Sequence, residues 1–79
     1  MKKEVAVLAK YRFERARETR KEAEILLSQE QINGAMNRIY YSLFYAVKAL
    51  LATKELDSSK HEGVISLFHK EFVKTGKFS

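Results

Sequence analysis

The fold is decided by the stretch from residue 33 to residue 54, which reads NGAMNRIYYSLFYAVKALLATK. Its apolar residues recur at intervals of three and four, so the pattern predicts one long α-helix. They cover more than half of the helix circumference and are Ala35, Met36, Ile39, Tyr40, Leu43, Phe44, Ala46, Val47, Leu50 and Leu51. An apolar side this wide must contact more than one neighbouring helix. We therefore expect residues 33–54 to be the central helix, with these side chains in the core.

A second long helix is predicted before the central one, over residues 4–28. Its apolar stripe is small in the middle, where Ala9, Ala16 and Ala23 recur, so a neighbouring helix can approach closely. Only a short polar break, residues 28–31, separates the two helices. A connection this tight predicts an antiparallel helical hairpin.

A third helix is predicted over residues 60–74. Ser59 is followed three residues later by Glu62, which fits a capping box, and Gly76 is placed to follow the last turn as its C′ residue. The chain contains no proline and only three glycines, which favours helix almost throughout. The sequence therefore predicts an all-α protein, an up-and-down antiparallel bundle with three helices in a single domain over residues 1–79.

Composition narrows the class of protein. The net charge of +5, from 15 basic and 10 acidic residues, favours an anionic partner such as nucleic acid, although soluble helical proteins also carry such charges. No apolar stretch is long enough for a membrane span and no apolar signal core follows the N-terminus, so we expect a cytoplasmic protein with no membrane partner. Without cysteine no disulfide can stabilise so small a chain. Wide apolar surfaces therefore predict a homo-oligomer, most simply a dimer.

The polar side of the central helix holds the residues best suited to bind a ligand. Arg38 and Tyr41 are three residues apart and Tyr41 and Tyr45 four apart, so the three side chains adjoin. Arginine binds phosphate and tyrosine stacks on a base, which favours a nucleotide or RNA site. The alternative interpretation is structural, because such residues also bind and stack on neighbouring helices. The candidate ligand-binding residues are Asn37, Arg38, Tyr41, Tyr45, Lys48 and, from the start of the third helix, His61.

A longer motif runs through this helix into the next. It reads Asn33-Gly34-Ala35-x-Asn37-Arg38-x-Tyr40-Tyr41-x-x-Phe44-Tyr45-Ala46, followed by His61-x-Gly63-Val64-Ile65. The motif resembles the HEPN family (higher eukaryotes and prokaryotes nucleotide-binding domain), in its small archaeal and bacterial branch related to the sacsin C-terminal domain. The resemblance implies a four- or five-helix bundle that commonly dimerises and is often encoded beside a minimal nucleotidyltransferase, in some pairs as toxin and antitoxin. It also implies that the family's C-terminal helices are missing and that this chain is C-terminally truncated.

The same resemblance bears on catalysis. Active HEPN ribonucleases carry an arginine, then a polar residue, and four to six positions on a histidine, and they cleave RNA without metal across a dimer. Arg38 matches the arginine, but Ile39 follows it and the histidine positions hold Leu43, Phe44 and Tyr45. Histidine is the side chain suited to proton transfer near neutral pH, whereas the phenol of tyrosine has a pKa of about 10. The resemblance therefore predicts a domain that does not cut RNA by the family's usual route.

The other candidate residues predict less. His61 and His69 are eight residues apart, too far for a metal pair on adjacent helical turns, so neither a metal nor a cofactor is predicted. The basic residues of the first helix alternate with glutamates, which predicts a solvated surface rather than an RNA track; they are Arg12, Arg15, Arg17, Arg20 and Lys21.

Three functions remain open. The first is a non-catalytic, self-associating HEPN-like domain that binds a nucleotide, RNA or a minimal nucleotidyltransferase, as in a toxin–antitoxin pair. The second is a metal-independent RNA endonuclease with a non-standard active site that uses Arg38 with Tyr45 or His61. The third is a structural fragment with no ligand. Loss of the histidine favours the first over the second.

Overall fold

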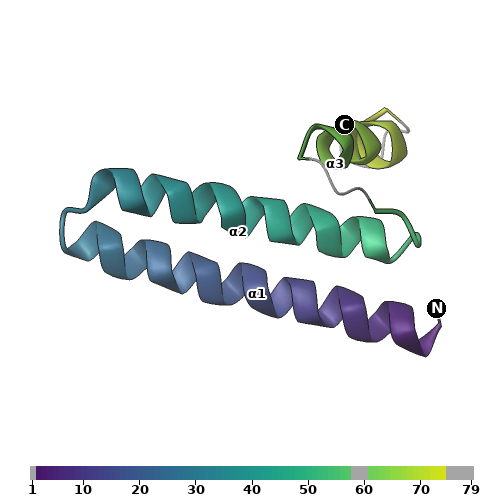
Figure 1. Cartoon of the computed structure of the whole chain (residues 1–79), viewed down its shortest axis with the longest axis horizontal. Helices are drawn as coiled ribbons and strands as arrows, with labels where there is room; N and C mark the ends of the chain where they lie inside the picture. The colour runs from purple at the N-terminus through teal and green to yellow at the C-terminus, as the bar shows by residue number, and fades with distance from the viewer. Residues whose placement is uncertain (1, 58–60, 75–79) are drawn as a thin grey trace.

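Two long antiparallel helices make up most of the computed structural model, which describes residues 2–57 and 61–74. Helix α1 (Lys3–Ser28) and helix α2 (Ile32–Ala52) lie side by side along almost their full length (Figure 1). The predicted hairpin is confirmed, and both helices begin within one residue of the predicted positions. Asn33 and Gly34 lie inside the first turn of α2 rather than at its start.

Small residues hold the hairpin together. The buried side chains of α1 are Ala9, Ala16, Thr19 and Ala23, which confirms the predicted stripe. Facing them, α2 buries Ala35 and Ala49, so the two backbones approach closely. Close approach continues to the turn, where a Cβ added to Gly34 would lie 3.3 Å from the Leu26 Cδ1 atom.

Each long helix ends in the same kind of cap. The Gln31 N–H donates to the Leu26 carbonyl at 2.8 Å, and the Leu56 N–H donates to the Leu51 carbonyl at 3.0 Å. These six-to-one bonds define Schellman motifs. Their left-handed positions are occupied by Glu30 (φ 60°) and Glu55 (φ 56°) instead of glycine. The second cap ends α2 at Ala52, two residues before the predicted end.

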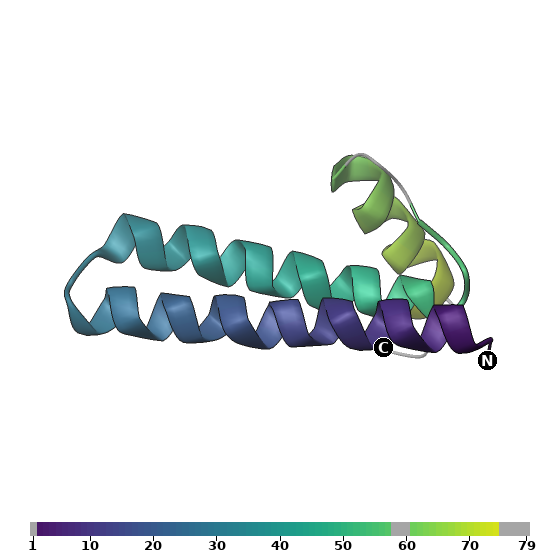
Figure 2. The same cartoon turned by 60° about the horizontal axis from the view of Figure 1, so that its bottom comes forward.

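Helix α3 (His61–Phe68) crosses the C-terminal part of α2 (Figure 2), and a π-helical segment, η1 (His69–Val73), follows it without a break. The Lys74 N–H donates to the His69 carbonyl five residues back, at 2.7 Å. Residues 60–74 were predicted as one regular helix, and the wider turn is a departure from that prediction. It places Phe72 in a core with Leu51 and Val64. The predicted caps at Ser59 and Gly76 lie outside the described residues.

The all-α class is therefore confirmed, but the predicted core is only partly correct. Leu51 is fully buried, and α3 packs onto the C-terminal half of the apolar side of α2. The N-terminal half of that side is exposed, with Met36 at 63% and Leu43 at 64%. Placing these residues in the core was wrong, because α1 contacts a different side of α2 and the short α3 does not cover them. Partly buried side chains complete the core: Phe44, Val47, Leu50, Leu56, Leu67 and Phe68.

Candidate functional site

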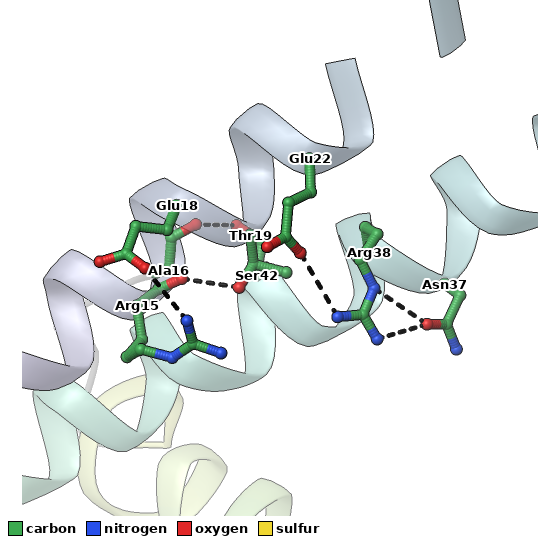
Figure 3. A network of polar contacts seen from close by, with 8 residues as sticks. All are labelled: Arg15, Ala16, Glu18, Thr19, Glu22, Asn37, Arg38 and Ser42. Atoms are coloured by element: carbon green, nitrogen blue, oxygen red, sulfur yellow. Dashed lines mark hydrogen bonds and ion pairs between the residues drawn. The ribbon is translucent and has the colours of Figure 1, made fainter. Parts of the chain in front are cut away.

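The polar side of α2 lies along one edge of the seam between the two long helices. At the middle of this seam the Ser42 hydroxyl donates to the Ala16 carbonyl at 2.8 Å. On α1 the fully buried Thr19 hydroxyl donates to the Arg15 carbonyl at 2.7 Å. Both hydroxyls are therefore satisfied by backbone carbonyls of α1, and the longer polar side chains lie around them (Figure 3).

Arg38 is held on three sides. Its Nε and Nη2 atoms donate to Asn37 Oδ1 at 3.1 and 2.7 Å, and its Nη1 atom lies 3.5 Å from Glu22 Oε1 on α1. The guanidinium carbon lies 5.3 Å from the centroid of the Tyr41 ring, within the range of a cation–π contact. The structure thus brings together Asn37, Arg38 and Tyr41, as predicted from their spacing. About a third of the arginine side chain, 32%, stays exposed, so its outer N–H groups can meet an anion.

Arg15 forms a second arrangement of the same kind, although its alternation with glutamates predicted a solvated surface. Its Nη1 atom donates to Glu18 Oε2 at 3.1 Å, and its guanidinium carbon lies 5.3 Å from the centroid of the Tyr45 ring. Hydrogen bonding to the Tyr45 phenol, and then to Glu18, raises the pKa of Arg15. In the sequence, Arg15 directly precedes Ala16, which belongs to the small-residue stripe that faces α2. This position beside the helix contact is the signal that could have identified Arg15.

Lys48 belongs to a different cluster. Its ammonium lies 3.5 Å from Asp57 Oδ1 and 5.8 Å from the centroid of the Phe44 ring. Arg12 joins the same cluster, because its Nη1 atom donates to the Lys48 carbonyl at 3.2 Å and its Nη2 atom to Asp57 Oδ2 at 2.9 Å. With only 12% of its side chain exposed, Arg12 fastens the segment after α2 to α1. Lys48 thus belongs to the cluster of Arg12 and Asp57, which joins the segment after α2 to α1, and not to the group around Arg38.

His61 begins α3, but its side chain is outside what the structure describes, and its predicted approach to Arg38 stays a prediction. In residues 2–57 and 61–74, no group of three or more histidine, cysteine, aspartate or glutamate side chains could hold a metal ion. The chemistry that the described residues support around Arg38 is the binding of a negatively charged, partly aromatic ligand.

The helical hairpin and its partly exposed arginine–tyrosine edge define a small all-α domain. The model of the HEPN domain matches residues 9–79, so the chain belongs to the HEPN family. This confirms the family resemblance of the central motif.

Several curated proteins are similar to the chain. A UPF0332 protein of Thermotoga maritima is 53% identical over 70 residues, which are 89% of this chain and 53% of the relative. A protein of Methanocaldococcus jannaschii named "Putative toxin" is 48% identical over 65 residues, 82% of this chain and 44% of that protein. A second protein of that organism with the same kind of name is 42% identical over 64 residues, 81% of this chain and 48% of its own length. The chain thus spans about half the length of the curated relatives it matches.

No solved structure matches the chain. Among the described residues no helix is both long enough and apolar enough to cross a membrane. Family membership, together with the names of two relatives, fits a role of the toxin–antitoxin type.

Proposed function

We propose that this chain is a non-catalytic HEPN domain that self-associates and binds a nucleotide or RNA through Arg38 and Tyr41. In this proposal it acts in the cytoplasm, in a toxin–antitoxin-type pair with a minimal nucleotidyltransferase. The observation that carries the proposal is the Arg38 guanidinium, which is stacked on Tyr41, oriented by Asn37 and still one-third exposed.

The orientation of Arg38 supports phosphate binding. A planar guanidinium binds a phosphate through two parallel N–H bonds, and it loses less entropy when neighbouring groups already hold it in place. Asn37 occupies the Nε edge, and Tyr41 lies against a face of the guanidinium. The Glu22 pair is a partly exposed ion pair of the kind that contributes little free energy, so a phosphate can replace it.

The exposed apolar side of α2 supports self-association. It borders an apolar groove of about 180 Å³ between α2 and α3, lined by Tyr40, Leu43, Phe44, Val47, Val64 and Ile65. Ile65 is 56% exposed at the rim, and Met36, Ile39 and Leu43 continue the surface along α2. Covering these side chains with a second copy would remove a large apolar surface from water, which is the main driving force of association.

The binding proposal is tested by titrating ATP and a fluorescein-labelled octauridylate against the wild type, Arg38→Ala and Arg20→Ala. Arg20 lies 3.7 Å from Glu24 on an exposed surface of α1, so Arg20→Ala is a control that removes the same charge away from the site. We expect Arg38→Ala to weaken binding of at least one ligand by about tenfold, the size of one lost charge-assisted hydrogen bond. Arg20→Ala should change it by less than about twofold. No binding by the wild type, or equal losses in both variants, would reject the proposal.

The alternative, a metal-independent RNA endonuclease, is kept because two relatives carry toxin names. Incubating the wild type and Arg38→Ala with RNA in the presence of EDTA separates the two functions. We expect intact RNA in both reactions. Cleavage by the wild type that disappears in Arg38→Ala would establish the endonuclease instead.

A further inference from the structure

The edge that carries Arg38 contains two arrangements of the same composition. In each, a guanidinium lies 5.3 Å from the centroid of a tyrosine ring of α2 and is paired with a glutamate of α1. One consists of Arg15, Tyr45 and Glu18. The other consists of Arg38, Tyr41 and Glu22, and the two arginines lie on either side of Thr19 and Ser42 (Figure 3).

The spacing of the two arrangements follows from helix geometry. Tyr41 and Tyr45 are four residues apart on α2, and Glu18 and Glu22 are four apart on α1. Four residues correspond to about 6 Å along a helix axis. Because each arginine lies against its own tyrosine and its own glutamate, the two guanidiniums are separated by about one helical turn. The edge therefore offers two separate positive groups in a row rather than one.

We infer that Arg15 and Arg38 together bind two neighbouring phosphates of single-stranded RNA, and that Glu18 and Glu22 hold the two arginines when RNA is absent. This inference rests on the proposed function and adds to it a second binding residue and a competing pair of carboxylates. A strand is favoured over a mononucleotide because the two guanidiniums come from different helices and both lie on an open edge, each 32% exposed. Tyr41 and Tyr45 beside them supply the ring faces on which successive bases stack.

The carboxylates make the site selective. In the free protein two glutamates balance the charge of two arginines, so a ligand must bring enough negative charge to replace both. Glu18 and Glu22 are 60% and 50% exposed, so they can swing into solvent without being buried elsewhere. A phosphate that accepts two N–H bonds from a guanidinium outcompetes a partly exposed ion pair, which is worth little.

The first test compares octauridylate binding by the wild type, Arg15→Ala, Arg15→Gln, Arg38→Ala and Arg20→Ala over a series of salt concentrations. We expect each change at Arg15 or Arg38 to weaken binding by about tenfold. Each should also lower the slope of log affinity against log salt by about 0.7, the value for one phosphate contact on a single strand. Arg20→Ala should change neither quantity. Arg15→Gln keeps the aliphatic stem and polar end of the side chain, so it tests the charge if Arg15→Ala lowers the helix content in circular dichroism.

The second test removes the competing carboxylates. Glu18→Gln and Glu22→Gln should each raise the affinity for octauridylate by about two- to fivefold, the range of a surface ion pair. Glu24→Gln makes the same change in net charge beside Arg20 and should leave the affinity within about twofold of the wild type. Equal gains in all three variants would mean a general effect of charge and would overturn the competing role.

The outcomes also separate this inference from the proposed function. Weaker binding in Arg38→Ala with unchanged affinity and salt slope in both Arg15 variants would leave the proposed site standing and overturn the two-phosphate site. The same conclusion follows if ATP binds as tightly as octauridylate and is insensitive to Arg15. Absence of any binding by the wild type would overturn both.

Discussion

The two sides of α2 contrast in a way that its sequence does not suggest. The polar edge, defined by Asn37, Arg38, Tyr41 and Tyr45, lies against α1 and its side chains are held in defined contacts. The apolar side, defined by Met36, Ile39, Tyr40 and Leu43, is between 46% and 64% exposed. The side that should bind a ligand is thus ordered by the fold, whereas the side that should form the core is available to another surface.

The contrast arises from the size of the residues in the seam. Two helices approach most closely where small side chains face each other, and the seam buries Ala9, Ala16 and Ala23 of α1 and Ala35 and Ala49 of α2. Because the polar edge borders that line of small residues, its side chains contact α1. The larger apolar side chains lie farther around the helix, and each partly exposed one forgoes part of the about 1.5–3 kcal/mol that full burial contributes. A small protein with that much unburied apolar surface has a strong physical reason to associate.

The largest expected effect comes from breaking the seam. Ala49→Leu would force a larger side chain into a fully buried position and separate the two helices. We expect the free energy of unfolding to fall by about 3 kcal/mol, at the upper end for overpacking, as measured by urea denaturation. The matched control is Ala6→Leu on an exposed position of α1, which should change stability by less than about 0.5 kcal/mol. Equal effects of the two variants would mean that small residues do not set the helix spacing.

The second prediction concerns the apolar side. Leu43→Glu places a charge on a side chain that is 64% exposed in the single chain but would be buried between two copies. We expect the dimer to weaken by at least tenfold in sedimentation velocity, since burying an unpaired carboxylate is costly. Ile25→Glu changes a residue of similar exposure, 58%, on α1, and should leave association unchanged. A wild type that stays monomeric at micromolar concentration contradicts the prediction.

The smallest effect is expected at the polar edge. Ser42→Ala removes the hydroxyl that donates to the Ala16 carbonyl and leaves the small size of the seam intact. One such hydrogen bond contributes about 1 kcal/mol, so thermal unfolding should show a loss of that order or less. Octauridylate affinity should fall slightly, because the bond lies between the two arginines. A loss as large as that of Ala49→Leu would mean that polar contacts, and not small residues, hold the hairpin together.

Much of the fold could be predicted from local patterns. The Ala9, Ala16 and Ala23 stripe was correctly placed against a neighbouring helix, and the short break after Ser28 correctly predicted the hairpin. The left-handed glutamates and the π-helical turn at His69 could not be predicted. Glutamate is not a typical cap residue, and the wider turn depends on where Phe72 finds its core.

Part of the candidate site could also be predicted from local sequence patterns. Spacing on one helix brought Asn37, Arg38 and Tyr41 together, because neighbours at three and four residues adjoin in any α-helix. Arg15 was missed, because its contact with Tyr45 joins residues thirty positions apart along the chain. Lys48 was included on spacing alone, and the structure engages it with Asp57 instead.

The sequence by itself determined that the chain is helical, where its helices begin, and which residues share a side of α2, since these follow from local periodicity and backbone preference. Only the tertiary structure decided which side of α2 faces α1. That choice depends on how closely two backbones can approach, which is set by small residues on both helices at once and not by the hydrophobicity of either alone. The same choice brought Arg15 beside Tyr45 and left Leu43 exposed.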